Sequence, residues 1–377
     1  MSSVVVMLRD ATVGACGGKA GALGALLREG LPVPDGFVVT AATTRAELAR
    51  ALQGLGDPVV AVRSSAAGED TAAASAAGQY ESFLGLQRVD DVCAAVDACR
   101  ESAQAARVQA YQARTGVEAG EVAVLVQSMV AADSSGVMFT PEHPGGPTRI
   151  EAAWGLGLGV VGGTVGPDSY EVATDGSVTV AVGGKQTRID LDPAGGLVRT
   201  EVSPVQQRGR TLYDDRVRRL TVLGRMVADV RGAPQDVEWA VVGTDIWVLQ
   251  ARPITAPVPG VVAPRSTVDG ELTGTPGSPG RLTAPARLVH GPNDFARVRP
   301  GEIIVCPYTD PAWTPLFTVA GGVVTETGGA LSHAAIVARE YGIPAVLGVA
   351  GALSRIVDGQ QIRLDGAAGT IAPTSGR

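Results

Sequence analysis

The sequence predicts an α/β (α+β) protein with two units joined by a linker, on three observations. The chain has 377 residues, which is more than one ordinary domain needs. Short apolar stretches typical of strands alternate with stretches of helical period along most of it. Residues 255–265, TAPVPGVVAPR, are rich in proline and lack periodicity, as a linker does. We therefore expect one domain over residues 1–255, a linker over 256–265 and a second domain over 266–377.

The composition argues against several classes of protein. A hydrophobic content of 45% is ample for packed cores, and a net charge of −7 argues against a nucleic-acid binder. No apolar run approaches the roughly 20 residues of a membrane span, and the N-terminus does not resemble a signal peptide. The four cysteines have no metal-like spacing. We expect them to be reduced thiols of a cytoplasmic protein.

Residues 14–40 begin with a glycine-rich loop that contains Lys19. A helix over 22–28, a proline-bounded turn and a strand over 37–40 are expected to follow. Backbone N–H groups and a lysine at a helix start can form a cradle for phosphate. Lys19 and Lys185 are the only lysines in the chain, so both are candidates for sites that need a compact ammonium group. An ordinary turn and chance are the alternatives.

Residues 58–86 place Arg63 near the end of an apolar strand, before a loop rich in alanine and glycine. A second strand is expected at about 80–86. This arrangement suits a phosphate clamp beneath a lid, and a solvated arginine is the alternative. A helix over 89–115 follows and carries Arg107. Further apolar stretches predict strands over 121–130, 136–140 and 148–152.

The stretch QDVEWAVVGTDIWVLQARPI predicts a β-hairpin. A register centred on Thr244 pairs Glu238 with Gln250. The same register pairs Asp236 with Arg252. Residues two apart in a strand share a face, so Glu238, Gln250 and Arg252 are expected to lie together. The other face is expected to carry the apolar side chains of Trp239, Val241, Trp247 and Leu249. Two oxygen-bearing groups opposite one another can hold Mg²⁺ against ATP phosphates, and a solvent-exposed polar face is the alternative.

The C-terminal part predicts a helix that begins at His333, in the stretch TETGGALSHAAIVAREY. The first turn of a helix favours an anion, so it would stabilise a phosphate attached to the imidazole. The same positive field lowers the pKa of the ring and keeps it neutral and nucleophilic. Gly328 and Gly329 allow a sharp turn beside a bulky polyphosphate. The hypothesis is a histidine that carries a phosphoryl group, and a surface histidine is the alternative.

These stretches together resemble the ATP-dependent phosphotransferases that include phosphoenolpyruvate synthase, pyruvate phosphate dikinase and rifampin phosphotransferase. Residues 1–255 are similar to the ATP-grasp nucleotide-binding domain of this family, through GGKAGALG, VRSSAAGED, AGQYESFLG, IEAAWGLG and WVLQARPI. Residues 266–377 are similar to its swivelling phosphohistidine domain, through GSPG, PYTDPAWTPLF and the His333 stretch. The resemblance covers nearly the whole chain and implies the family's chemistry.

The resemblance implies a role for each candidate residue. ATP binds in the first domain, and His333 takes its β-phosphate, leaving AMP and releasing the γ-phosphate as inorganic phosphate. Glu238 and Gln250 resemble the Mg²⁺ ligands of the family. The family's phosphate-binding residues are matched by Lys19, Arg63, Arg107, Lys185 and Arg252. The segment that contacts adenine in the family is matched by Gln127, Met129 and Val130.

Two departures from the family limit what can be carried over. A large central acceptor-binding domain is typical of the family, and in its place this sequence has a short linker. We therefore expect the acceptor to be an unknown hydroxyl-bearing small molecule, bound between the two domains or on a separate protein. Leu331 stands two residues before His333, where plant-type dikinases have a regulatory threonine, so that form of control is not expected.

Three functions fit these observations. The first is an enzyme that phosphorylates a metabolite or an antibiotic through phospho-His333. The second is a phosphocarrier subunit that takes phosphate from ATP and acts only with a partner protein. The third is a non-catalytic ATP binder, which is disfavoured because every candidate catalytic residue is present.

A swivelling histidine requires a linker that permits a large rotation. Shortening or stiffening residues 255–265 is therefore expected to spare ATP binding and to slow phosphoryl transfer. Calorimetric titration with ATP measures the first property, and the rate of AMP formation measures the second. Unchanged turnover in such variants would count against a swivel.

Overall fold

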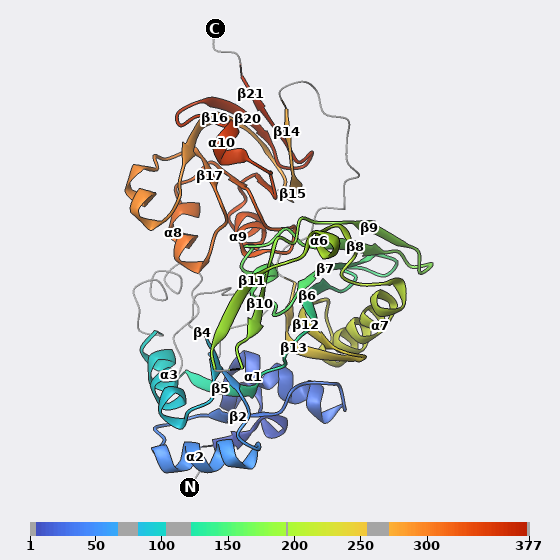
Figure 1. Cartoon of the computed structure of the whole chain (residues 1–377), viewed down its shortest axis with the longest axis vertical. Helices are drawn as coiled ribbons and strands as arrows, with labels where there is room; N and C mark the ends of the chain where they lie inside the picture. The colour runs from blue at the N-terminus through green and yellow to red at the C-terminus, as the bar shows by residue number, and fades with distance from the viewer. Residues whose placement is uncertain (1–4, 67–81, 103–121, 194, 255–270, 375–377) are drawn as a thin grey trace.

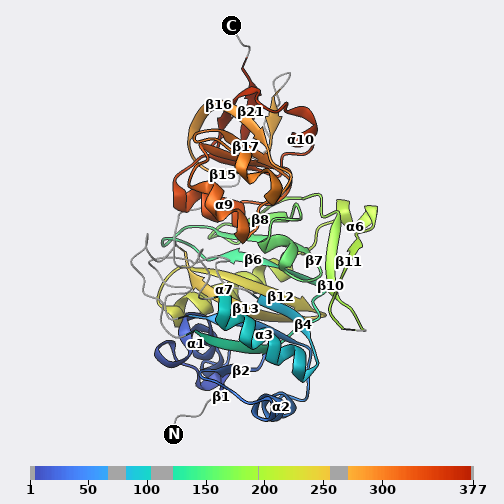
Figure 2. The same cartoon turned by 90° about the vertical axis from the view of Figure 1, so that its left-hand side faces the viewer.

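The computed structural model describes residues 5–66, 82–102, 122–193, 195–254 and 271–374. These ranges fold into three larger sheets with covering helices, which confirms the α/β (α+β) class. In Figures 1 and 2 the first and last sheets form opposite ends of the molecule and the second lies between them. The expected linker over 256–265 lies outside the described residues, so the domain boundary stays a prediction. None of the described helices combines the length and apolar character required to cross a lipid bilayer.

The first sheet has five antiparallel strands in the order β1-β2-β5-β3-β4. The strands are β1 (Val5–Met7), β2 (Gly36–Val39), β5 (Ala123–Ser128), β3 (Val60–Ser65) and β4 (Ser82–Leu86). The elements around it are η1 (Leu8–Asp10), α1 (Val13–Arg28), α2 (Arg45–Gly54) and α3 (Val89–Ser102). Because side chains alternate along β2, Phe37 and Val39 pack with α2 and α3, whereas Val38 packs with α1.

Two helices differ from the expected extents. The helix expected over 22–28 begins at Val13, and only Gly17 within it has a non-helical backbone, with φ 79°. A Cβ at Gly17 would lie 1.9 Å from the backbone oxygen of Ser65, so only glycine allows α1 to approach β3 this closely. The expected glycine-rich loop is therefore mostly helical. The helix expected over 89–115 is present as α3, and its remainder lies outside the described residues.

The second sheet has six antiparallel strands in the order β13-β12-β6-β7-β8-β9. The strands are β13 (Asp245–Pro253), β12 (Gln235–Val242), β6 (Ser134–Phe139), β7 (Thr148–Trp154), β8 (Asp168–Val172) and β9 (Val178–Ala181). Beside it lie α5 (Leu158–Val161), β10 (Thr187–Leu191), β11 (Leu197–Glu201), α6 (Pro204–Arg208) and α7 (Asp214–Arg231). One apolar core joins α1, α7 and this sheet, around Trp239, Tyr170 and Met138.

The third sheet has eight strands in the order β14-β21-β20-β16-β17-β18-β19-β15. They are β14 (Leu272–Thr273), β21 (Thr370–Pro373), β20 (Gln361–Asp365), β16 (Arg281–Leu288), β17 (Ile303–Cys306), β18 (Gly322–Thr325), β19 (Ala345–Leu347) and β15 (Thr275–Ser278). The helical elements are η2 (Pro292–Arg297), η3 (Pro311–Trp313), α8 (Thr314–Phe317), α9 (His333–Tyr341) and α10 (Ala352–Arg355). Ile304 and Val323 pack under α8 and α9, and Ile303 and Val324 pack under α10. α9 lies at the junction with the second sheet (Figure 1).

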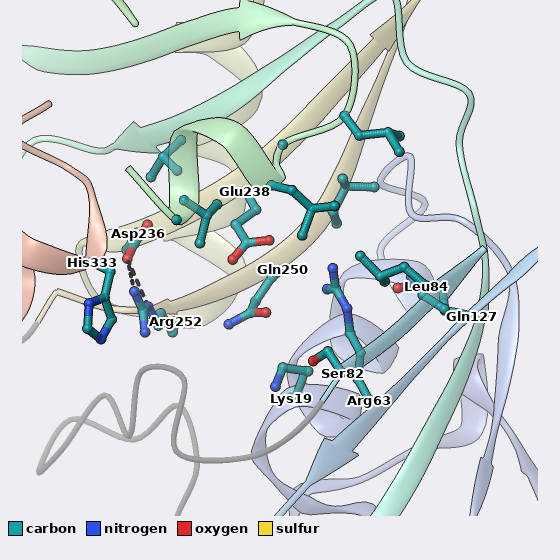
Figure 3. Close-up of a pocket in the computed structure, with 18 of the residues that line it drawn as sticks. Lys19, Arg63, Ser82, Leu84, Gln127, Asp236, Glu238, Gln250, Arg252 and His333 are labelled. Atoms are coloured by element: carbon teal, nitrogen blue, oxygen red, sulfur yellow. Dashed lines mark hydrogen bonds and ion pairs between the residues drawn. The ribbon is translucent and has the colours of Figure 1, made fainter. Parts of the chain in front are cut away.

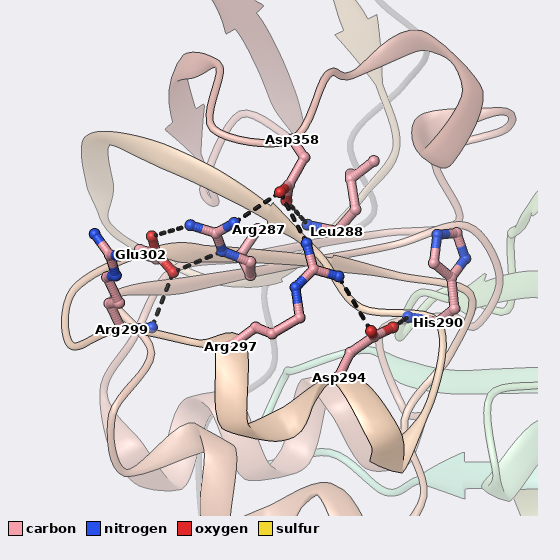
Figure 4. A network of polar contacts seen from close by, with 8 residues as sticks. All are labelled: Arg287, Leu288, His290, Asp294, Arg297, Arg299, Glu302 and Asp358. Atoms are coloured by element: carbon pink, nitrogen blue, oxygen red, sulfur yellow. Dashed lines mark hydrogen bonds and ion pairs between the residues drawn. The ribbon is translucent and has the colours of Figure 1, made fainter.

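A network of ion pairs surrounds the C-terminal end of β16, a central strand of the third sheet (Figure 4). Arg287 of β16 donates to Glu302 through two bonds, of 2.7 and 3.0 Å, and to Asp358 at 2.7 Å. Arg297 joins Asp358 to Asp294. The hydrogen bond from Arg287 is the main reason that the pKa of Glu302 lies below its usual range. Burial would raise this pKa, but the contacts with Arg287 and Arg299 together outweigh it. The network ties together β16, η2 and the loops before β17 and β20.

Arg287→Ala should destabilise the protein by roughly 3–5 kcal/mol, because it leaves the buried Glu302 carboxylate without its cation. Arg281→Ala is the matched control, since Arg281 is 80% exposed in its pair with Asp365 and such pairs contribute roughly 0–1 kcal/mol. Urea unfolding of both variants measures the difference. Equal loss of stability in the two would show that the Arg287 network contributes no more than a surface ion pair.

Candidate active site

A cavity of about 240 Å³ lies where the three sheets meet. Its walls come from α1, β3 and β5, from the β12–β13 hairpin, and from the start of α9 (Figure 3). The candidate residues of the sequence that line it are Lys19, Arg63, Gln127, Met129, Val130, Glu238, Gln250, Arg252 and His333. Arg107 lies outside the described residues. The fold therefore collects into one cavity side chains as far apart in the chain as Lys19 and His333.

Lys19 enters the cavity immediately after the break in α1. Its ammonium group donates to the backbone oxygen of Ser64 at 3.3 Å, and its side chain is only 6% exposed. Ser65 fixes the same turn, because its hydroxyl donates to Cys16 O at 2.7 Å and accepts from Ala20 N at 3.0 Å. The lysine is thus held at the end of β3, where its charge faces the cavity.

Arg63 extends from β3 into the same part of the cavity (Figure 3). Its Nη1 atom is buried and has no hydrogen-bond partner among the described residues. A buried guanidinium nitrogen without an acceptor is costly, so an anionic ligand at this point would be stabilised. Lys19 and Arg63 together make this wall of the cavity positive.

The end of β5 and the two residues that follow it form another wall. Gln127 is buried and donates its side-chain amide to the backbone oxygen of Pro34 at 3.1 Å. Met129 is held by a bond from its own N–H to Val59 O at 2.8 Å, and its sulfur accepts from Gly85 N. Met129 and Val130 therefore present a fixed, mostly apolar surface, which suits the flat face of a nucleobase.

The β12–β13 hairpin has the predicted pairing at its functional end. Glu238 lies opposite Gln250 and Asp236 opposite Arg252. Nearer the turn the prediction was wrong, because a β-bulge shifts the register by one residue after Glu238. Leu249 consequently lines the cavity. Trp247 packs beside Leu249, and not on the opposite face of the hairpin with Trp239 as predicted.

Glu238 and Gln250 provide a carboxylate and an amide oxygen on neighbouring strands, both directed into the cavity (Figure 3). Oxygen ligands of this kind suit Mg²⁺, which commonly takes one or two protein ligands and completes its shell with phosphate oxygens and water. Within the described ranges, no group of three or more His, Cys, Asp or Glu side chains could hold a metal alone. The pair therefore fits a cation that arrives with a nucleotide.

Asp236 and Arg252 form a buried ion pair beside His333. The Arg252 Nε and Nη2 atoms both lie 2.8 Å from Asp236 Oδ2. This pair fixes the guanidinium close to the histidine ring (Figure 3). The sequence predicted that Asp236 and Arg252 pair but assigned Asp236 no role. Its position two residues before Glu238, on the same face of β12, is the signal that could have identified it.

His333 is the first residue of α9 and is buried against the cavity. Its Nδ1 atom lies 3.1 Å from the hydroxyl of Thr309, and its Nε2 atom has no partner among the described residues. Burial and, secondly, the positive charge of Arg252 lower the pKa of His333 to about 4. The ring is consequently neutral at pH 7. With the proton on Nδ1, donated to Thr309, the lone pair of Nε2 is free to attack.

Lys185 does not join this site. It is fully buried and forms an ion pair with Asp168, which also accepts bonds from Gly183 N and Thr211 N. It does not line the cavity. This position corrects the sequence prediction that Lys185 binds phosphate. Its rarity drew attention to the lysine, but in the structure it neutralises a buried carboxylate.

Two residues that contact the histidine segment were not singled out from the sequence. Thr309 lies in PYTDPAWTPLF, a motif whose chemistry gave no reason to select one hydroxyl. Glu151 of β7 is buried and accepts a hydrogen bond from Leu331 N at 3.2 Å. A single carboxylate in the apolar strand TRIEAAW is the signal that could have identified it.

Residues 44–263 match the family model of the pyruvate phosphate dikinase AMP/ATP-binding domain, and residues 298–369 match that of the PEP-utilising enzyme mobile domain. A probable phosphoenolpyruvate synthase of Methanothermobacter thermautotrophicus is 33% identical over 95% of this chain and 61% of its own length. One from Archaeoglobus fulgidus is 34% identical over 94% of this chain and 56% of its own.

The phosphoenolpyruvate synthase of Escherichia coli is 37% identical over 82% of this chain and 42% of its own length. The chain therefore spans between 42% and 61% of the length of these three relatives.

NMR titration of the imidazole C–H signals tests the state of His333. The signal of His333 is identified by its absence from the spectrum of His333→Asn. It is expected to keep the chemical shift of a neutral imidazole until the pH approaches about 4. Arg252→Met should raise this pKa, because it removes a positive charge that disfavours the imidazolium. Arg281→Met, outside the cavity lining, is the control for loss of a charge. A His333 signal that titrates near 6.5 in the unmodified protein would contradict the buried, neutral ring.

Proposed function

The chain belongs to the superfamily of pyruvate phosphate dikinase and phosphoenolpyruvate synthase, and from this premise we propose that it is an ATP-dependent phosphotransferase of the dikinase type. It converts ATP into AMP and inorganic phosphate and passes the β-phosphate through phospho-His333 to an acceptor. The observation that carries the proposal is the Nε2 of a buried histidine, without a partner among the described residues, in the cavity that Lys19 and Arg63 make positive.

The first step forms an N–P bond and breaks a P–O bond. The Nε2 lone pair attacks the β-phosphorus of ATP, the bond from this phosphorus to the oxygen it shares with the α-phosphate breaks, and AMP leaves with that oxygen. Water then cleaves the β–γ linkage and releases inorganic phosphate. Thr309 holds the Nδ1 proton throughout, so that Nε2 remains the reacting atom.

The residues around the ring suit the charge that this step creates. Arg252 lies beside His333, where it first keeps the imidazole unprotonated and then binds the phosphoryl oxygens. Asp236 positions Arg252 through their buried ion pair. Lys19 and Arg63 bind the remaining phosphates. Glu238 and Gln250 would hold Mg²⁺, which neutralises phosphate charge when it is bound.

The acceptor is proposed to be a hydroxyl-bearing small molecule, as in the tailoring of a metabolite or an antibiotic. The alternative is a phosphocarrier that delivers phosphate to an acceptor bound by a separate protein. Both require the same phospho-His333 and differ only in what removes the phosphate. A second protein is needed for turnover in the carrier and is dispensable in the autonomous enzyme.

Incubation with Mg²⁺ and ATP labelled at the β- or the γ-phosphate tests the proposal. Acid-labile label from the β-phosphate is expected on the wild-type protein, together with AMP, and should be absent from His333→Ala. Retention of the label by His333→Ala, or formation of ADP as the product, would contradict the dikinase chemistry. Turnover with small hydroxyl compounds alone would favour the autonomous enzyme.

A further inference from the structure

The loop before α9, residues 327–332, is the part of the C-terminal region that docks onto the second sheet. The Thr327 hydroxyl donates to the backbone oxygen of Gly163 at 2.6 Å. The side chain of Leu331 is 2% exposed and packs into an apolar cluster with Phe139 and Val160. These contacts join β18 and α9 to β6, β7 and α5. The contacts of Thr327 and Leu331 attach the loop to the second sheet, but they do not fix the position of the backbone between them.

Glu151 determines that position. Its buried carboxylate accepts a hydrogen bond from the backbone N–H of Leu331 at 3.2 Å, and the N–H of Ala330 also lowers its pKa. Gly329 passes so close that a Cβ there would lie 2.3 Å from Glu151 Oε1. The backbone of Gly329 does not lie in the left-handed region, and the three atoms nearest to such a Cβ all belong to the Glu151 carboxylate. The loop is therefore fitted around this one group.

We propose that Glu151 is a positioning residue for phosphoryl transfer: by binding the backbone of residues 329–331 it sets where His333, at the start of the next helix, enters the ATP cavity. The inference rests on the proposed function and goes beyond it, because Glu151 does not line the cavity and touches no reacting atom. A directed hydrogen bond to a buried carboxyl group specifies the register of the loop, which an apolar contact such as that of Leu331 leaves loose.

Burial of this carboxylate also makes docking depend on pH. Burial raises the pKa of Glu151 to about 7, and the loop N–H groups and the charge of Arg339 from α9 partly oppose the rise. When the loop departs, water reaches the carboxylate and its pKa falls towards the ordinary value of 4.5. Docking therefore takes up a proton. It is strongest below the undocked pKa and weakens as the pH rises through about 7.

A pair of complementary substitutions tests the role of Glu151. Gly329→Ala should slow the formation of phosphohistidine on His333 roughly a hundredfold while leaving the Kd for ATP unchanged, because the new methyl group meets the carboxylate and displaces the loop. Glu151→Ala should slow it only roughly tenfold, through loss of the hydrogen bond to the loop. In the double variant the steric block is gone, so its rate should rise from that of Gly329→Ala to that of Glu151→Ala.

The control for added bulk is Gly291→Ala, where a Cβ meets nothing within 4 Å. Glu151→Gln keeps an oxygen acceptor and should retain most of the rate while losing its decline between pH 6 and 8. Thermal unfolding of each variant verifies folding. A wild-type rate in Glu151→Ala, or no recovery in the double variant, would overturn the proposal.

The His333 NMR titration separates this proposal from the proposed function, since it requires neither ATP nor chemistry. In Gly329→Ala the His333 pKa should rise towards 6.5 as the ring leaves the cavity, and it should fall again in the double variant. These shifts would support positioning by Glu151 even if no phosphohistidine ever formed. Unchanged His333 titration in both Gly329→Ala and Glu151→Ala would overturn positioning even if phosphohistidine formed normally.

Discussion

The site depends on keeping one imidazole nitrogen unprotonated inside a positively charged cavity. A histidine exposed to water would be partly charged near neutral pH, whereas burial next to Arg252 lowers the pKa of His333 to about 4. The same guanidinium that disfavours the imidazolium is complementary to a phosphate on the ring. Asp236 keeps this guanidinium in place. In the proposed reaction, phosphorylation would thus convert an unfavourable neighbour of His333 into a favourable one.

In the proposed reaction this requirement conflicts with a second one, that His333 leave the cavity. A histidine that visits an acceptor elsewhere needs a docked state only slightly more stable than the undocked one. Leu331 supplies apolar contact, and Glu151 adds a hydrogen bond at the cost of desolvating a carboxylate. The favourable contacts and the cost of desolvation therefore offset one another in the free energy of docking. A fully apolar interface of the same size would hold His333 more tightly and would slow its departure.

Much of this arrangement could be predicted from the sequence, because it depends on local periodicity and on short motifs. The pairing of Glu238 with Gln250 follows from the turn of one hairpin, and the helix at His333 follows from its flanking glycines and apolar positions. The bulge after Glu238 could not be predicted, since it satisfies packing of Trp247 and Leu249 against residues distant in sequence. The roles of Lys185 and Glu151 could not be predicted for the same reason. Their roles are set by partners that only the fold brings near, Asp168 for the lysine and the loop before α9 for the glutamate.

The charges of the cavity indicate why a divalent cation belongs to the proposed reaction. Among the described residues that line it, three are cationic, Lys19, Arg63 and Arg252, and two are carboxylates, Asp236 and Glu238. Arg252 is already balanced by Asp236, which leaves two cations and Glu238 to meet a triphosphate. The charges of these described residues alone cannot neutralise so much negative charge, and Glu238 would repel it. Glu238 and Gln250 would hold a magnesium ion that offsets this repulsion, so that the one carboxylate unfavourable to ATP would become part of its binding site.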